Sequence, residues 1–296
     1  MSSPTKKAAR RESMSSTLKC FQALELLAQE PYEFPLSELA ARLEQPLASV
    51  HRLVATLVEA GFAEQDGASR RYRLAGKALW AGAGYLRNSP VYRASFLVMQ
   101  EAARTSAGLI HLGALHGEWV LYLHTVGSPS RLYLYADTGE RRPLHATGLG
   151  KAILAWQPTE LVNRIGAQRL PRFTKHTICS LSDLKEELKG IRQRGYAIDN
   201  EEGVIGLRCV AAPIFDASGV SVAALSMSAP AQVMTRQAIE TSAAQIREAA
   251  MKISVQVGYR PASSNMLSLI SGERKRYLRS RMCWLESSAW CVLKVA

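Results

Sequence analysis

Several features that would assign a chain to a familiar class are missing from this sequence. No apolar run reaches the ~18 residues that suggest a membrane-spanning helix. The first 13 residues, MSSPTKKAARRES, carry no apolar core behind their charges, so they do not resemble a secretory signal. A GxSxG elbow, a P-loop, an HExxH motif and a dinucleotide fingerprint are also absent, as are internal repeats. We therefore expect a cytoplasmic protein that does not act on a membrane and is not an enzyme of a familiar motif class.

Cysteine is scarce and dispersed. The chain has five cysteines and no CxxC pair. An odd, scattered set indicates reduced thiols in a cytoplasm, and argues against both a disulfide framework and a zinc cluster. We expect no metal and no cofactor. The five are Cys20, Cys179, Cys209, Cys283 and Cys291.

The balance of charge is positive, and its position along the chain matters more than its size. The 296 residues, enough for two ordinary domains, carry a formal net charge of +12, which favours a polyanionic partner. Residues 20–69 nevertheless hold more acids than bases. The bases lie on either side, where they suit contacts to a DNA backbone. They are Lys6, Lys7, Arg10, Arg11 and Lys19 before this stretch and Arg70, Arg71 and Arg73 after it. For residues 1–13, a solvated disordered tail explains the charges equally well.

Residues 35–74 have the pattern of a winged helix-turn-helix. A short first helix, with Ser37 as its expected N-cap, is followed by a break before Pro46 and a second helix that ends at Gly61. Residues 62–65, a turn at Asp66 and Gly67, and residues 70–74 then predict a hairpin. The apolar stripes are Leu36, Leu39, Ala40 and Leu43 in the first helix and Val50, Leu53, Val54 and Leu57 in the second.

The polar face of this unit predicts contact with double-stranded DNA. Two helices joined by a tight turn let the second enter a major groove while the hairpin reaches neighbouring phosphates. Arg52 is the best candidate for a bidentate contact to guanine. Plain helix packing is the alternative explanation of the pattern. The expected base-reading residues are Ser49, His51, Arg52 and Thr56, and the expected phosphate-binding residues are Arg70, Arg71 and Arg73.

The remaining elements predict a second domain of α+β class. A helix over 17–30 precedes the helix-turn-helix, and helices over 76–87 and 91–107 connect the helix-turn-helix to the second domain. Apolar residues of this connection suit a dimer contact or packing on the second domain: Leu79, Trp80, Val91, Phe96 and Leu97. Strands are expected over 109–115, 119–126, 132–135, 196–199, 209–215 and 220–227, and helices over 148–156, 159–168, 182–194 and 234–257. This order suggests an antiparallel sheet flanked by helices.

Four further segments complete a family resemblance. They are residues 143–152 (PLHATGLGKA), 194–202 (RGYAIDNEE), 206–213 (GLRCVAAP) and 225–228 (LSMS). Together with the winged helix-turn-helix, and over roughly residues 15–258, the chain resembles the IclR (isocitrate lyase regulator) family of bacterial transcription factors. The resemblance implies a winged-helix head (15–75) after a basic arm (1–14), a linker helix region (76–107) and a GAF-like effector domain (108–258). It further implies dimers, or dimers of dimers, on palindromic operators, and a small organic acid as effector.

The chemistry of these segments agrees with an effector site. Exposed N–H groups where a loop becomes a helix at Gly148 attract a carboxylate, although a glycine-rich helix entry also suits packing alone. Asp199 and Glu202 are compatible with binding a hydroxyl or a metal, or with solvation. Cys209 by itself is typical of a core thiol, and Ser226 and Ser228 alternate on one strand and so face one side. The residues that the resemblance assigns to the cavity are Thr147, Gly148, Leu149, Asp199, Glu202, Cys209, Ser226 and Ser228.

These observations predict a ligand-responsive DNA-binding regulator, a repressor or an activator, of a catabolic operon. The bulk of Leu149 favours a larger or aromatic acid over a two- or three-carbon acid. The alternatives are an enzyme acting on a small carboxylic acid and an architectural DNA-binding protein without an effector. Residues 259–296 depart from the family pattern; the basic run 273–277 suits an amphipathic helix, a basic tail or an out-of-frame extension.

Overall fold

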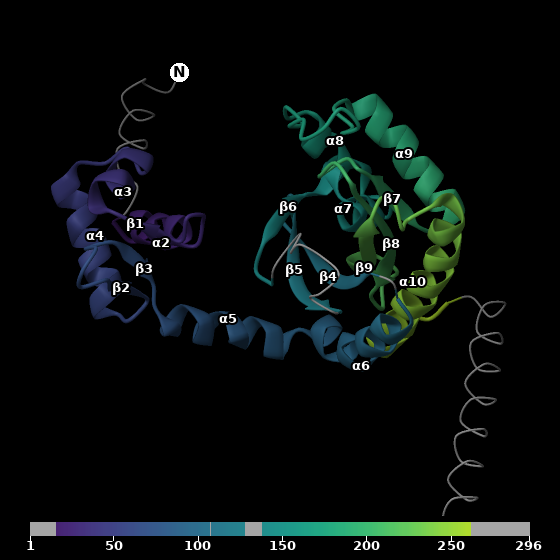
Figure 1. The fold of residues 1–296 in the computed structure, drawn as a ribbon, viewed down its shortest axis with the longest axis horizontal. Coiled ribbons are helices and arrows are strands. Elements are labelled where there is room, and N and C mark those ends of the chain that lie inside the picture. Colours follow the sequence, from purple (N-terminus) through teal and green to yellow (C-terminus); the bar gives the residue numbers. More distant parts are fainter. Residues whose placement is uncertain (1–15, 107, 128–137, 262–296) are drawn as a thin grey trace, which may run out of the picture. The chain divides into compact units, whose positions relative to one another are not determined.

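The structure, a computed structural model, describes residues 16–261 with the exception of 107 and 128–137. The expected arm, the strand over 132–135 and all but the first residues of the extension lie outside the described residues. The chain divides between Ser89 and Pro90 into two compact units (Figure 1). This boundary falls inside the predicted connection, 76–107. Among the described residues, no helix combines the length and the apolar character that crossing a membrane requires.

The first unit is a winged helix-turn-helix, as predicted. Its helices are α2 (Ser16–Leu27), α3 (Leu36–Arg42), α4 (Leu47–Glu59) and α5 (Gly76–Asn88). Strands β2 (Ala63–Gln65) and β3 (Tyr72–Leu74) form the expected antiparallel hairpin. A two-residue strand, β1 (Glu33–Phe34), pairs with the other edge of β3 and was not predicted, because two residues carry no periodicity. This small sheet therefore joins the hairpin to the segment between α2 and α3.

Three local predictions in this unit need correction or receive support. Ser37 is not an N-cap: Pro35 occupies that position, and α3 begins without a side-chain cap. Helix α2 ends at Leu27, before the predicted Glu30. Gly61 has φ +78°, the left-handed conformation expected of a residue that ends a helix. The core consists of Ala23, Leu26, Leu27, Phe34, Leu39, Ala40, Val50, Val54, Leu57, Ala63 and Tyr72.

The second unit is built on an antiparallel sheet of six strands in the order β6-β5-β4-β9-β8-β7. The strands are β4 (Leu109–His116), β5 (Trp119–Val126), β6 (Arg141–Pro143), β7 (Ala197–Asn200), β8 (Leu207–Phe215) and β9 (Ser221–Pro230). Five of the six predicted strands are present at nearly the predicted positions. The short edge strand β6 lies between the predicted strand over 132–135 and the predicted helix over 148–156, where no strand was predicted.

Helices cover both faces of this sheet (Figure 1). Helices α6 (Pro90–Thr105) and α10 (Arg236–Gln256) pack on one face, and α7 (Gly148–Leu154) packs on the other, against β8 and β9. A 3₁₀ turn, η2 (Leu144–Ala146), leads into α7, and α8 (Thr159–Gly166) and α9 (Leu181–Arg194) lie outside it. The α+β class with an antiparallel sheet is confirmed. The second face, between the sheet and α7, carries the predicted effector residues.

Candidate functional site

Helix α4 presents the polar face that the sequence predicted. His51, Arg52 and Thr56 are exposed and Ser49 is half-buried, while the apolar stripe is buried on the opposite side. The Thr56 hydroxyl donates to the Arg52 carbonyl oxygen at 2.9 Å, so it is left to act as an acceptor. Arg52 is therefore the strongest hydrogen-bond donor on this face.

Grooves run along both sides of that face. One is lined by Leu36, Leu47, Ala48, His51 and Arg52, and the other by Ser16, Lys19, Gln45, Ser49, Arg52, Leu53 and Thr56. Lys19, which the sequence analysis grouped with the basic residues before residues 20–69, lies on α2 and donates to Gln45 Oε1 at 2.9 Å. The structure thus adds a fixed positive charge beside the recognition helix.

The three basic residues of the hairpin differ in what they contact. Arg70 is exposed, with φ +58°, in the turn that joins β2 and β3. Arg71 donates to the Glu33 carbonyl oxygen at 3.4 Å, and Arg73 forms an exposed ion pair with Glu64 at 2.7 Å. Arg70 is consequently the residue most available to a phosphate, whereas Arg71 also ties β3 to β1.

All eight predicted effector residues are buried on one face of the second unit. A Cβ built on Gly148 would lie 3.4–3.7 Å from the Cβ atoms of Ala211, Cys209 and Asp199, so α7 begins directly above β7 and β8. Cys209 pairs with Ser228 across β8 and β9, and the Ser228 hydroxyl donates to Cys209 Sγ at 3.0 Å. The structure therefore brings together residues that are up to 81 positions apart (Thr147 to Ser228).

The entry to α7 is tightly built. The Thr147 hydroxyl accepts from the Gly150 N–H at 3.0 Å, which caps the helix. Leu149 packs toward Gly113 of β4, where a Cβ would lie only 2.9 Å from Leu149 Cδ1. The small residues at 113, 148 and 150 thus let this helix approach the sheet closely.

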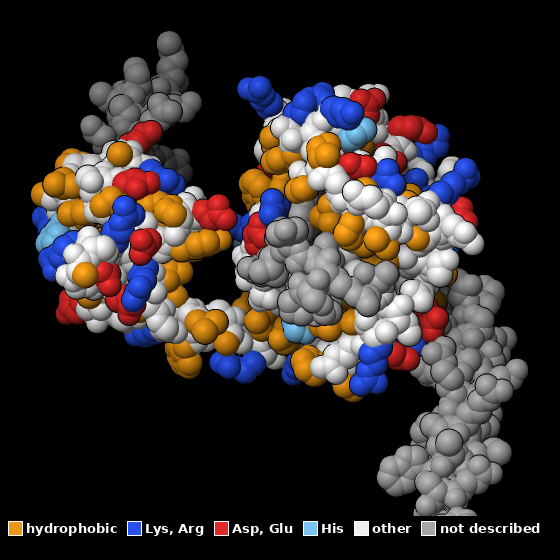
Figure 2. Space-filling model, viewed as in Figure 1, with side chains coloured by type: hydrophobic (Ala, Val, Ile, Leu, Met, Phe, Trp, Pro, Cys, Tyr) orange, Lys and Arg blue, Asp and Glu red, His pale blue; other side chains and the backbone are white. Residues whose placement is uncertain are grey.

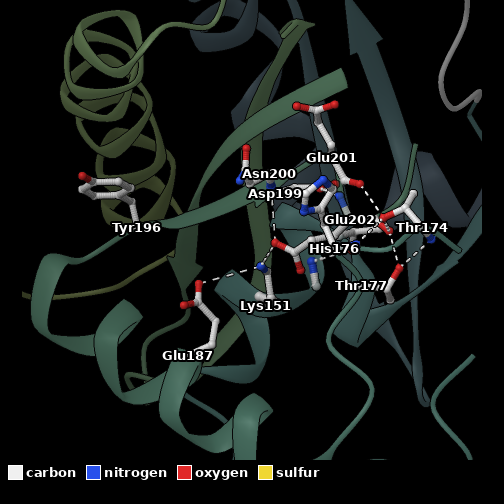
Figure 3. Close-up of polar contacts among 12 residues, drawn as sticks. Lys151, Thr174, His176, Thr177, Glu187, Tyr196, Asp199, Asn200, Glu201 and Glu202 are labelled. Carbon is white, nitrogen blue, oxygen red and sulfur yellow. Dashed lines mark hydrogen bonds and ion pairs between the residues drawn. The ribbon is translucent and has the colours of Figure 1, made fainter. Parts of the chain in front are cut away.

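A buried ion pair includes one of the eight predicted effector residues, Glu202 (Figure 3). Lys151, 1% exposed, donates from Nζ to Glu202 Oε1, and Glu187 Oε1 lies 3.8 Å from the same nitrogen. The backbone carbonyl of Glu202 accepts from Thr177 at 2.7 Å, which anchors the corner after β7. Glu202 Oε2 has no hydrogen-bond partner among the described residues. Because Glu202 neutralises Lys151, the lysine is not a free anchor for a ligand carboxylate.

Asp199 is the most perturbed carboxyl group here. Burial, with repulsion from Glu202, raises the pKa of Asp199 to about 7, although its Oδ1 accepts from the Glu202 N–H at 2.8 Å and Lys151 opposes the shift. The protonated form is thus populated near neutral pH, and it adds a hydroxyl donor beside Cys209.

This shift predicts a pH-dependent stability. A carboxyl whose pKa is higher in the folded state stabilises the fold at low pH and loses that contribution as pH rises toward about 7. Between about pH 4 and 7 the free energy of unfolding should fall by up to ~1.4 kcal/mol per pH unit from this group. Calorimetric unfolding of the wild type and Asp199→Asn at several pH values measures the difference. Parallel pH profiles of the two proteins would contradict the shift.

Comparison with known proteins decides the family. The model of the IclR helix-turn-helix domain matches residues 16–67, and that of the bacterial transcriptional regulator IclR C-terminal domain matches residues 83–255. The chain belongs to the IclR family. The KdgR transcriptional regulator of Dickeya chrysanthemi is 38% identical over 249 residues, which cover 84% of this chain and 81% of that protein.

Solved IclR-family structures share the fold. The Thermotoga maritima IclR structure has a TM-score of 0.66 at 30% identity and covers 83% of this chain and 100% of its own. An IclR homologue from Microbacterium hydrocarbonoxydans, solved with 4-hydroxybenzoate, has a TM-score of 0.71 at 24% identity, with 82% and 99% covered. This IclR-family chain is a DNA-binding transcriptional regulator that responds to a ligand.

The sequence did not predict two polar groups near the site of this IclR-family chain, Lys151 as a partner and His111. Glu202 was predicted as a ligand contact, but its ion pair with Lys151, 51 residues away, was not predicted. His111, a polar residue inside the apolar strand 109–115, was not singled out, yet it is buried on the same face. His145 has a structural contact, Nε2 to the Pro171 carbonyl oxygen at 3.0 Å, and burial lowers the pKa of His145.

Proposed function

We propose that this regulator controls a catabolic operon in the cytoplasm by binding a palindromic operator, in response to a small organic or aromatic acid. In this proposal residues 15–75 bind DNA, 76–107 connect and 108–258 bind the effector. The observation that carries this proposal is the burial of the eight effector residues around Gly148 in the second unit. In the same chain, the first unit exposes Arg52 on α4.

For the DNA-binding unit, we assign base reading to Ser49, His51, Arg52 and Thr56 and phosphate contacts to Arg70, Arg71 and Arg73. The support is their place on α4 and the hairpin, where all are exposed except Ser49 and Arg71, which are half-buried. Arg70 is the cleanest probe of a backbone contact, because Arg71 and Arg73 also make contacts within the sheet.

Arg52→Ala should lower affinity for the operator about 5–150-fold, corresponding to the ~1–3 kcal/mol of a bidentate base contact, with a smaller loss on random DNA. Arg70→Ala should weaken binding to both DNAs alike. It should also reduce the slope of log affinity against log salt concentration by about one. The measurement is fluorescence-anisotropy titration with a fragment selected from random DNA by the wild type and an unselected fragment of equal length. Equal losses from Arg52→Ala on both fragments would reject its role in base reading.

For the effector-binding unit, we assign Thr147, Gly148, Leu149, Asp199, Glu202, Cys209, Ser226 and Ser228 to the ligand. The Ser226 hydroxyl and protonated Asp199 offer hydroxyl donors that suit the oxygens of an acid, while the Ser228 hydroxyl, which donates to Cys209 Sγ, offers an acceptor oxygen. The complex of an IclR homologue with 4-hydroxybenzoate supports an aromatic acid as one member of the class. We propose that the acid is bound and released chemically unchanged. Conversion of the acid to a product during incubation with the protein would refute its role as an effector.

Self-association follows from the operator symmetry that we propose. Helix α5 has no buried residue, and Leu79 and Trp80 are 78% and 68% exposed; Figure 2 shows hydrophobic side chains along it. We infer that a second copy of the chain covers this helix in a dimer or tetramer. Effector binding then alters the spacing of paired DNA-binding units and so changes operator affinity.

A further inference from the structure

His111 lies at the centre of the six-stranded sheet with half of its hydrogen-bonding capacity unused. It is 1% exposed on β4, and its Nδ1 lies 3.0 Å from Thr125 Oγ1 of β5. Its ring meets Tyr122 edge-on, with centroids 5.7 Å apart. Its other nitrogen, Nε2, is buried and has no hydrogen-bond partner among the described residues.

The strand registers show which way His111 points. His111 pairs with Ser226 of β9, and Ser226 also pairs with Ala211 of β8. Directly paired residues on neighbouring strands share a face of the sheet. Gly148 sits against Ala211, so this face is the one beneath α7. His111 therefore faces the same side as the proposed effector residues Ser226 and Ser228.

An unpartnered buried nitrogen destabilises the fold, since a polar group buried without a partner has lost its hydrogen bonds to water and gained none in the protein. An apolar side chain would fill this position without that cost. Burial lowers the pKa of His111 to about 4, so the ring is neutral near pH 7. The Thr125 hydroxyl either donates to Nδ1 or accepts from it; where it donates, the neutral ring carries its proton on Nε2, which is then a donor without an acceptor among the described residues.

We propose that the acid group of the effector lies at the Ser228 and Cys209 end of the site, and that His111, in the tautomer with its proton on Nε2, donates to a second oxygen function of the effector. This inference rests on the proposed effector site. Ser226, opposite His111, and Ser228 are two residues apart on β9, which places them about 7 Å apart. A para-substituted aromatic acid or a chain of about four to six carbons with oxygens at both ends spans this length, whereas a two-carbon acid does not.

The test compares matched pairs of probes that differ in the second oxygen function. The pairs are 4-hydroxybenzoate with benzoate and adipate with hexanoate, titrated by calorimetry into the full chain. For the wild type, the second function should strengthen binding about tenfold, as a hydrogen bond at the upper end of the usual range does. His111→Leu should abolish this preference, and His111→Gln, which keeps a donor, should retain part of it. Ile110→Val, on the neighbouring residue of the opposite face, is the control and should retain all of it.

Each outcome has a distinct meaning. If one or both pairs bind but His111→Leu keeps the tenfold preference, or weakens both members alike, the His111 assignment is overturned and the effector site stands. If no probe binds the wild type, the proposed acid site falls and the inference falls with it. A second readout needs no variant: on addition of 4-hydroxybenzoate to ¹⁵N-histidine-labelled protein, the His111 Nε2 resonance should move more than Nδ1. A stationary Nε2 resonance with bound probe would overturn the proposal.

Discussion

Lys151→Met should lower the free energy of unfolding of the second unit by about 3–5 kcal/mol, the usual cost of removing one partner from a buried ion pair. Methionine keeps the length of the side chain but leaves the Glu202 carboxylate buried, at 8% side-chain exposure, without its cation. One oxygen of that carboxylate already has no partner among the described residues. Scanning calorimetry of the full chain follows the transition of this unit separately from that of the first.

Two variants control for this prediction. Lys189→Met makes the same chemical change at an exposed pair, Lys189 with Glu186 at 3.8 Å, and should change the free energy of unfolding by less than ~1 kcal/mol. Adding Glu202→Gln to Lys151→Met removes the uncompensated charge and should restore most of the loss. A loss below ~1 kcal/mol in Lys151→Met alone would show that the pair is not the buried interaction described above.

Gly150→Ala should destabilise the second unit by about 2–3 kcal/mol, at the upper end of what overpacking costs in a close-packed interior. A Cβ at this position would lie 2.3 Å from the Leu144 carbonyl oxygen and 2.5 Å from Leu144 Cα. These are backbone atoms of η2, which cannot move without displacing Thr147 and Gly148 at the effector site. Urea unfolding followed by intrinsic fluorescence measures the loss.

Gly190→Ala in α9 is the matched control. There a new Cβ would meet only the Nη1 atom of Arg194, at 3.2 Å, which is the far end of a flexible side chain. Because alanine favours a helix over glycine by ~1 kcal/mol, this variant should be neutral or slightly stabilising. If Gly150→Ala is tolerated as well as Gly190→Ala, η2 and α7 are not in the close contact that the structure shows.

Apolar periodicity in the sequence was sufficient to predict the helices and strands that bury a regular set of apolar residues. The stripe of Val50, Val54 and Leu57 predicted α4, and the strands β4 and β5 were located to within one residue. Elements without a period were missed: β1 and β6 have two and three residues, and they exist because β3 and β5 offer them an edge. The Ser37 cap failed because a capping residue type predicts a cap only when the helix begins directly after it.

The sequence by itself determined the family and the two kinds of unit, because these depend on local pattern and motif. The positions for contact with DNA and with the effector stay predictions of the same motifs. Only the tertiary structure decided which side chains contact one another. Lys151 meets Glu202, and His111 pairs with Ser226 on the neighbouring strand, because strand register and helix packing join segments separated by 51 and 115 residues. Burial then sets the charge states, raising the pKa of Asp199 and lowering that of His111. Desolvation depends on everything packed around a group, and no local pattern of residues encodes it.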